Sequence, residues 1–312
     1  MNEKLPLHTK HRPDTFDKVI GNADMMVSLR SILDRDEGVP HALLFYGPSG
    51  CGKTTLARIV ADELRCSAHD FHEYNAADTR GIDTVREIAA NCAFMPMSGP
   101  VRVYLLDECH RLTQDGANAL LKVLEEPPSH AYFILCTTEP EKLLATIKTR
   151  CSAFQVRLLE PPDMTKLLNT VCEYEGAGFP AKIVKEIVYA AQGSPRNALV
   201  ILDQVIDIED DEQALAAIGE LALGEAEVID ICRAFMGQDS RVNKWKTVAG
   251  LLKKMDVDAE TARHQIGGYL AAVLMKNGDL AVAEMLELFS ESLIYSGKPG
   301  LVVACFLACQ VK

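Results

Sequence analysis

The sequence predicts an α/β domain built on a parallel sheet, followed by two all-helical units. Short apolar runs alternate with helical patterns in the first half of the chain, and only helical patterns follow in the second half. The pair Pro161-Pro162 separates the two halves, since proline cannot continue a regular element. The predicted domains are therefore 1–160, which contains the sheet, and two helical units at 161–224 and 225–312.

Five runs in the first 160 residues are mostly apolar, as expected for strands of a sheet that is buried on both faces. The predicted strands are Ala42–Tyr46, Phe71–Asn75, Val101–Leu106, Tyr132–Thr137 and Ala153–Val156. The helical patterns between them are Thr54–Arg65, Ile82–Ala93 and Ala117–Glu126. This alternation is typical of a doubly wound sheet with right-handed crossovers.

The rest of the chain shows apolar residues at helical spacing. Three helical stretches, 163–175, 180–192 and 195–206, are expected to form the first helical unit. The acidic segment Asp207–Glu212 is predicted to be a linker or an exposed turn. From Glu225 onward the pattern is helical, with breaks at Gly237, Gly278 and 296–299.

The composition excludes some classes of function. The net charge of −12 argues against a protein that coats nucleic acid, although a local basic surface stays possible. Ten cysteines without a Cys-x-x-Cys pair indicate free thiols. Residues 1–10 contain no apolar signal region, and no apolar run is long enough to span a bilayer. We therefore expect a cytoplasmic protein, or one in the host cytoplasm if its source is viral.

The clearest chemical motif is the segment 47–54, Gly-Pro-Ser-Gly-Cys-Gly-Lys-Thr, which has the eight-position phosphate-loop pattern between a strand and a helix. Its glycines let backbone N–H groups point at phosphate oxygens, and the helix N-terminus attracts an anion. Lys53 is expected to reach the β- and γ-phosphates of ATP, and Thr54 to ligate Mg²⁺. The residues predicted here to bind nucleotide are Gly47, Pro48, Ser49, Gly50, Cys51, Gly52, Lys53, Thr54 and Thr55.

A second motif is the apolar strand 103–106, which ends in Asp107 and Glu108. Both carboxylates are expected beside the phosphate loop, at the carboxyl edge of the sheet. Asp107 is then suited to hold Mg²⁺ through water, and Glu108 to polarise the attacking water. The string Asp107–His110 also spells the DExH sequence of helicases, but the chain is too short for two tandem motor domains.

Six further segments share their residues with one protein family: 10–13, Phe16 with 19–21, 75–83, 118–128, 149–151 and 193–199. Together they resemble the clamp-loader ATPases of the AAA+ family. The first two look like the adenine-binding opening of these proteins. The segment 75–83 resembles replication factor C small subunits, and 118–128 is similar to the gamma/tau subunit of bacterial DNA polymerase III. The last two match the Ser-Arg-Cys motif and the sensor 2 helix.

The resemblance implies an AAA+ domain, a helical lid and a helical collar through which subunits oligomerise, with ATP and Mg²⁺ as cofactors. It places Arg12, Pro13, Val19 and Ile20 around the nucleotide. The remaining implied roles are Thr138 as sensor 1, Arg196 as a contact to the γ-phosphate of the chain's own ATP, and Arg150 as an arginine finger acting in trans on the ATP of a neighbouring subunit.

The implied partners are other clamp-loader subunits in a ring or spiral, a sliding clamp and primer-template DNA, with no membrane. Arg80 and Arg86 occupy the helix start at which family members face the DNA backbone, and the alternative is a solvated helix face. The apolar segment Ala93–Met97 is either a clamp-binding surface or local packing beneath a loop.

Two features depart from the family pattern. The segment between Leu64 and Phe71 lacks the four zinc cysteines of the bacterial gamma/tau subunits, and Thr149 replaces the usual serine. This mixture leaves a cellular or a viral origin, such as a phage, open. The expected function is an ATP-hydrolysing subunit that opens the clamp and places it on DNA during replication. The alternatives are a non-hydrolysing stator subunit, or another DNA-remodelling AAA+ ATPase such as a branch-migration motor or a helicase loader.

Overall fold

The computed structural model describes residues 5–35, 38–77, 82–208, 210–222, 226–237, 240–255, 259–293 and 297–311. The packing of the backbone divides the chain into two compact units, Met1–Asp207 and Ile208–Lys312. The finer division into three domains, with boundaries at 160 and 224, stays a prediction.

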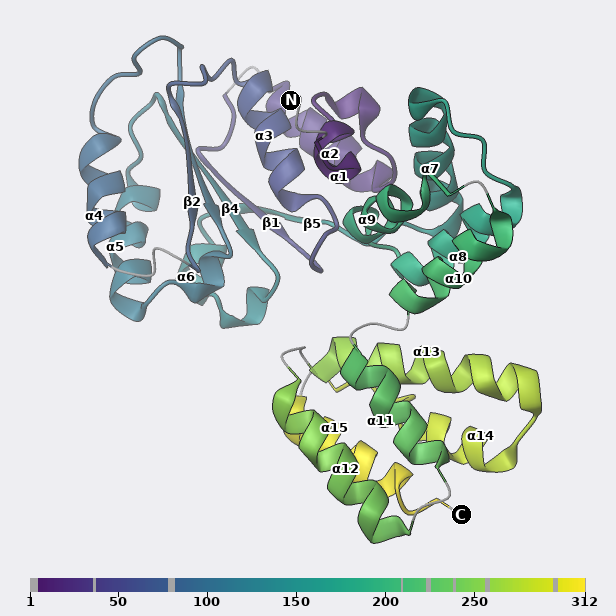
Figure 1. Ribbon diagram of the computed structural model, residues 1–312. Coiled ribbons are helices and arrows are strands. Elements are labelled where there is room, and N and C mark those ends of the chain that lie inside the picture. Colours follow the sequence, from purple (N-terminus) through teal and green to yellow (C-terminus); the bar gives the residue numbers. More distant parts are fainter. Residues whose placement is uncertain are drawn as a thin grey trace. The chain divides into compact units, whose positions relative to one another are not determined.

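The first unit is built on a five-stranded parallel sheet with the order β2-β3-β4-β1-β5 (Figure 1). The strands are β1 (Ala42–Tyr46), β2 (Phe71–Asn75), β3 (Arg102–Asp107), β4 (Ala131–Thr137) and β5 (Ser152–Gln155). The predicted parallel sheet is confirmed. Strand β4 lies between β1 and β3, with Thr137 opposite Tyr46 and Leu135 opposite Leu106. The carboxyl ends of these three strands therefore meet at one edge of the sheet.

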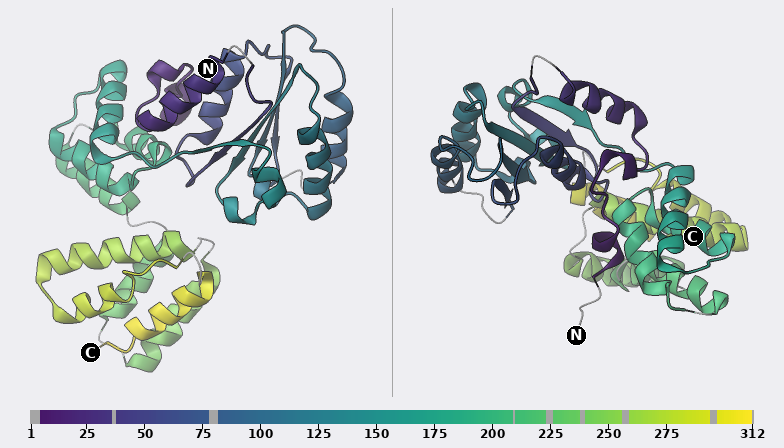
Figure 2. Two further views of the ribbon diagram at one scale, coloured as in Figure 1. Left: turned by 180° about the vertical axis from the view of Figure 1, so that it is seen from behind. Right: turned by 90° about the horizontal axis from the view of Figure 1, so that it is seen from above.

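Helices cover both faces of the sheet, which explains why its central strands β1, β3 and β4 are mostly apolar runs. The helices and turns around the sheet are α1 (Leu7–Lys10), η1 (Phe16–Lys18), α2 (Ala23–Leu33), α3 (Lys53–Glu63), α4 (Ile82–Asn91), η2 (Cys109–Arg111), α5 (Gln114–Glu125), η3 (Pro140–Lys142) and α6 (Ala145–Lys148). Phe45 packs with α2 and α3, whereas its neighbour Leu44 packs with α4 and α5. Figures 1 and 2 show α3 and α4 on opposite faces.

Three helices follow the sheet: α7 (Pro161–Glu175), α8 (Ala181–Ala191) and α9 (Pro195–Val205). Proline stands at the start of α7 and of α9, where its missing N–H costs nothing. The Ser194 hydroxyl caps α9 by accepting a hydrogen bond from the Asn197 N–H at 3.3 Å. Helix α1 packs against α9, so the N-terminal segment and the predicted lid are neighbours in this unit.

The segment 156–159, which joins β5 to α7, is held between two glycines. A Cβ added to Gly47 would lie 2.0 Å from the carbonyl oxygen of Val156, and one added to Gly193 would lie 2.9 Å from Cβ of Leu158. Both glycines also have positive φ angles. The backbone N–H groups of Val156 and Leu159 donate to the carbonyl oxygens of Tyr46 and Gly193, each at 2.8 Å. Backbone therefore packs directly on backbone here.

The second unit is helical throughout its described part, and the predicted fold class is thereby confirmed. Its helices are α10 (Asp211–Ala222), α11 (Ala226–Met236), α12 (Arg241–Lys254), α13 (Ala259–Asn277), α14 (Leu280–Glu287) and α15 (Gly297–Ala308). Helix α10 begins inside the predicted linker 207–212, because the Asp210 carboxylate accepts a hydrogen bond from the Glu212 N–H at 3.1 Å and so caps it. None of the described helices is both long enough and apolar enough to cross a membrane.

Candidate nucleotide-binding site

The phosphate loop 47–52 connects buried strand β1 to helix α3. Lys53, the first residue of α3, is only 6% exposed. Its ammonium donates to the carbonyl oxygens of Gly47 at 2.9 Å and Pro48 at 2.8 Å, so the loop curls around the cation. The loop thus combines a positive charge with the N-terminus of a helix, which is the arrangement that binds phosphate.

Thr54 and Asp107 meet beside this loop. The Thr54 hydroxyl donates to Oδ2 of Asp107 at 2.8 Å, although the two residues belong to α3 and β3. Oδ1 of Asp107 accepts a hydrogen bond from the Glu108 N–H at 2.9 Å. A hydroxyl and a carboxylate are the oxygen ligands that Mg²⁺ prefers, so these two side chains fit the predicted metal.

Glu108 follows β3 in a left-handed backbone conformation, with φ of 49°. Such a conformation is uncommon outside glycine and is often found at functional sites. Thr138, directly after β4, donates its hydroxyl proton to Oε2 of Glu108 at 3.0 Å. Because β4 lies between β1 and β3, Thr138 reaches the edge of the sheet between the phosphate loop and Glu108.

Two adjoining hollows lie at this edge of the first unit. The larger has a volume of about 110 Å³. Four residues that were predicted to bind nucleotide line this hollow and not the other: Pro13, Val19, Ile20 and Cys51. The smaller has a volume of about 60 Å³. The predicted site residues that line only this hollow are Ser49, Lys53, Thr54, Asp107 and Glu108. Both hollows share Arg12, Gly50, Gly52, Thr55 and Arg196. An apolar hollow next to a polar one suits a base with a phosphate chain.

The shared arginines make this region electropositive. Burial, and then the neighbouring Arg58 and Arg196 guanidinium groups, lower the pKa of Arg12. Cations that repel one another in this way are stabilised when an anion binds between them. The phosphate end of the site therefore favours a highly charged anion.

Some residues of the larger hollow were not predicted from the sequence. They are His8, His11, Lys18, Asn22, Leu56, Val156, Leu159, Leu167, Pro195 and Leu199. His11, Pro195 and Leu199 lie inside segments that carried the family resemblance. The ammonium of Lys10 and the ring of His11 both contact the Glu175 carboxylate at the end of α7, which ties the N-terminal segment to the predicted lid. The apolar residues Leu56, Val156, Leu159 and Leu167 carry no motif that could have revealed them.

The predicted residues outside the two hollows have other surroundings. Arg150 follows α6, donates to the carbonyl oxygen of Thr146 at 2.9 Å and pairs with Glu125, so it lies outside the chain's own site. Arg86 lies on α4 with a 66% exposed side chain, 3.4 Å from the Asp83 carboxylate. Arg80 lies outside the described residues.

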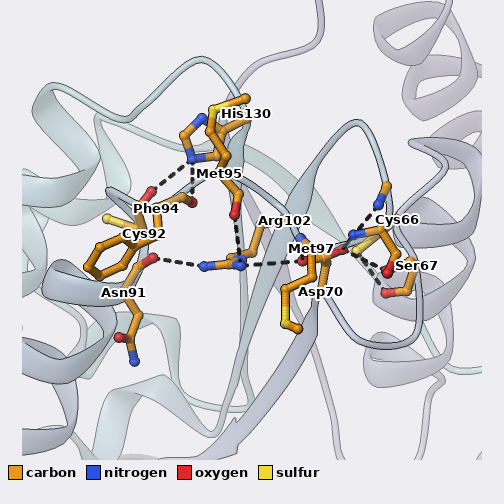
Figure 3. A network of polar contacts seen from close by, with 12 residues as sticks. Cys66, Ser67, Asp70, Asn91, Cys92, Phe94, Met95, Met97, Arg102 and His130 are labelled. Carbon is orange, nitrogen blue, oxygen red and sulfur yellow. Dashed lines mark hydrogen bonds and ion pairs between the residues drawn. The ribbon is translucent and has the colours of Figure 1, made fainter.

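A network of buried polar contacts holds the loop that follows α4 (Figure 3). The Arg102 guanidinium, 3.3 Å from the Asp70 carboxylate, donates to the carbonyl oxygens of Asn91 at 2.9 Å and Met95 at 3.1 Å. His130 contacts the carbonyl oxygens of Cys92 at 3.0 Å and Phe94 at 2.9 Å. The network therefore fixes the carbonyl groups at the start of the loop, those of Asn91, Cys92, Phe94 and Met95.

Asp70 fixes the other end of this loop. Its carboxylate, fully buried, accepts from the N–H groups of Met97 at 2.6 Å, Ser98 at 2.9 Å and Gly99 at 3.1 Å. Burial alone would raise the pKa of Asp70, but the Ser67 hydroxyl and these three N–H groups hold it well below its ordinary value. The apolar side chains of the loop point outward instead: Phe94, Met95 and Met97 are 66%, 71% and 79% exposed. Local packing therefore does not explain them.

The fold and the site define a class of protein, the AAA+ P-loop ATPases. Within it, 251 residues are 36% identical to the DNA polymerase III subunit gamma/tau of Mycobacterium tuberculosis, covering 72% of this chain and 43% of that one. The tau subunit of Bacillus subtilis is 30% identical over 322 residues, covering 95% of this chain and 53% of that one. Residues 68–160 match the family "DNA polymerase III, delta subunit". The chain is thus similar to DNA polymerase III gamma/tau subunits over most of its own length, as its motifs indicated.

Solved structures agree at the level of the fold. The RuvB Holliday junction branch migration motor of Thermotoga maritima has a TM-score of 0.60 at 19% identity, covering 76% of this chain and 85% of that one. An identity this low shows a shared AAA+ fold and nothing further. The chain spans about half the length, or less, of the gamma/tau relatives named above.

Proposed function

We propose that this chain is an ATP-hydrolysing subunit of a sliding-clamp loader, which opens the clamp and places it on primer-template DNA. The observation that carries the proposal is the contact of Thr54 with Asp107 beside the phosphate loop, with Glu108 and Thr138 paired next to it. These are the parts that phosphoryl transfer needs, in a chain related to clamp-loader subunits.

Each residue of the site then has a task in the reaction. The backbone of the phosphate loop and Lys53 bind the phosphate chain, and Thr54 and Asp107 hold Mg²⁺. When bound, Mg²⁺ neutralises charge on the β- and γ-phosphate oxygens. Glu108 accepts a proton from the attacking water, and Arg196 stabilises the charge on the γ-phosphate.

The position of Arg150 supports a site shared between subunits. It lines neither hollow and lies where a neighbouring chain can be reached, at 33% side-chain exposure. We therefore propose that Arg150 acts on the ATP of the next subunit in a ring or spiral. Head-to-tail contacts of this kind generate such assemblies.

The fixed apolar loop supports a protein partner. Three large apolar side chains, Phe94, Met95 and Met97, are exposed on a backbone that buried contacts hold in one shape. A preorganised apolar surface loses little conformational entropy on binding. We propose that this loop contacts the sliding clamp, and that Arg86 contacts DNA phosphates.

The test is steady-state ATP hydrolysis in the presence of the clamp and primer-template DNA. Lys53→Ala should weaken ATP binding itself, whereas Glu108→Gln should bind ATP and Mg²⁺ but lose turnover. Turnover within about tenfold of wild type in Glu108→Gln, a change under roughly 1.4 kcal/mol in the barrier, contradicts the role of Glu108. Stimulation by DNA without any effect of the clamp favours another DNA-remodelling motor, and ATP binding without turnover favours a stator subunit.

The shared site has its own test by complementation. Arg150→Ala should bind ATP normally but fail to support hydrolysis at the next subunit. Mixing it with Lys53→Ala, which keeps Arg150, should restore activity at mixed interfaces. Size-exclusion chromatography shows first whether the two variants co-assemble. Co-assembled but inactive mixtures exclude action in trans.

A further inference from the structure

His110 is a buried histidine between two glutamates at the edge of the sheet. It lies in η2, directly after β3, and its side chain is 4% exposed. Nδ1 is 3.3 Å from Oε2 of Glu108 and 3.0 Å from the Thr137 hydroxyl. Nε2 is 3.1 Å from Oε1 of Glu139. The ring therefore lies between Glu108, which is proposed to take the proton of the attacking water, and Glu139, which lines neither hollow.

The two groups that contact the Glu108 carboxylate reach the same oxygen. Oε2 accepts from the Thr138 hydroxyl at 3.0 Å and lies 3.3 Å from Nδ1 of His110. Two contacts on one oxygen fix the rotation of the carboxylate and leave Oε1 for the water. Proton abstraction depends strongly on such positioning.

Glu139 is itself held in place. Its backbone N–H donates to the Thr137 hydroxyl oxygen at 3.0 Å, and its carboxylate pairs with Lys142 in the same turn. The Nε2 contact therefore anchors the histidine ring to a fixed point beyond β4. A carboxylate behind a histidine orients the ring for work at its other nitrogen.

We propose that His110 is a positioning residue for the ATPase reaction, and this inference rests on the proposed function. Held at Nε2 by Glu139 and at Nδ1 by the Thr137 hydroxyl, the ring lies against Oε2 of Glu108 and turns Oε1 toward the attacking water. His110 lines neither nucleotide hollow, so its removal should lower kcat and leave nucleotide affinity unchanged.

Two amide variants separate the two ring nitrogens. In His110→Asn the side-chain NH₂ group takes the place of Nδ1, and in His110→Gln it takes the place of Nε2. We expect His110→Gln to lower kcat roughly tenfold, about 1.4 kcal/mol, and His110→Asn to retain activity within about threefold of wild type. Titration with a fluorescent ATP analogue should give wild-type affinity for both. Equal losses in the two variants, or a loss of affinity that matches the loss of kcat, overturn the proposal.

Two more variants keep the test decisive. Glu139→Gln weakens only the anchor, as His110→Asn does, so it should lower kcat by no more than about threefold at constant affinity, and it reports on the anchor even if a change at His110 disturbs folding. In a Glu108→Gln background, His110→Gln should cause no further loss, since the two residues act through one carboxylate. A further loss refutes the inference alone. A wild-type chain that binds ATP but never hydrolyses it refutes the proposed function, and the inference falls with it.

Discussion

Replacing Asp70 by asparagine is predicted to destabilise the first unit by about 3 to 5 kcal/mol, the range for removing one partner of a buried ion pair. The carboxylate is fully buried and faces Arg102, the Ser67 hydroxyl and three backbone N–H groups. An asparagine of the same size would lose the charge and turn an NH₂ group toward some of these donors. This loss is a large part of a typical stability of about 5 to 15 kcal/mol.

For a unit of this size, that change corresponds to a fall in Tm of roughly 6 to 20 °C. Urea unfolding followed by circular dichroism measures the loss in the free energy of unfolding. The single tryptophan, Trp245, lies in the second unit, so its fluorescence gives a transition that should not move. Asp83→Asn is the matched control, since that aspartate also pairs with an arginine but is 91% exposed. A loss under about 1 kcal/mol, or a loss equal to that of the control, refutes the reasoning.

The same pair predicts a pH dependence with a definite sign. The pKa of Asp70 is lower in the folded chain than its ordinary value of about 3.9, so between the two values the unfolded chain binds more protons. The stabilisation by Asp70 is therefore complete above about pH 5 and is lost as the pH falls through the lowered pKa. The difference between wild type and Asp70→Asn should shrink in acid. A constant difference below pH 4 contradicts this account.

Three other changes test other parts of the molecule. Gly47→Ala should weaken binding of a fluorescent ATP analogue, because the new Cβ would meet the Val156 carbonyl oxygen; Gly38→Ala, also at positive φ but in open space, is the control. Arg86→Ala should reduce the slope of DNA affinity against salt by about one, and equal slopes would exclude a phosphate contact. Glu125→Gln should free Arg150 and raise ATP turnover in the assembly by about twofold, since the pair is partly exposed, while the chain's own ATP affinity stays constant.

Much of the fold was predictable because its central strands are buried on both faces and are therefore mostly apolar runs. Strand β1 has the predicted bounds, and so does the edge strand β2, although β2 is only partly buried. Helix α2 was not predicted; it lies before the first strand, with only Met26 and Leu29 buried, and this short apolar pattern is weak. The order of the strands was also beyond prediction, since it depends on packing between elements distant in the sequence.

The site also contains residues that the sequence predicts and residues that it does not. Lys53, Thr54 and Asp107 lie in motifs whose spacing reflects a fixed backbone shape, and the structure brings them together. Glu139 carries no motif, because its contact with His110 exists only where β4 lies beside β3. Likewise Asp70 and Arg102 are 32 positions apart, and neither residue alone indicates a buried pair.

The connection between β5 and α7 passes between Gly47, the first residue of the phosphate loop, and Gly193, two residues before α9, and neither glycine has a side chain to act as a spacer. Atoms in such contact cannot be compressed, so a shift of the phosphate loop must displace the connection and, with it, the start of α7. The phosphate loop, this connection and the start of α7 are therefore coupled through direct backbone contact. A larger residue at Gly47 or Gly193 would have to displace this connection.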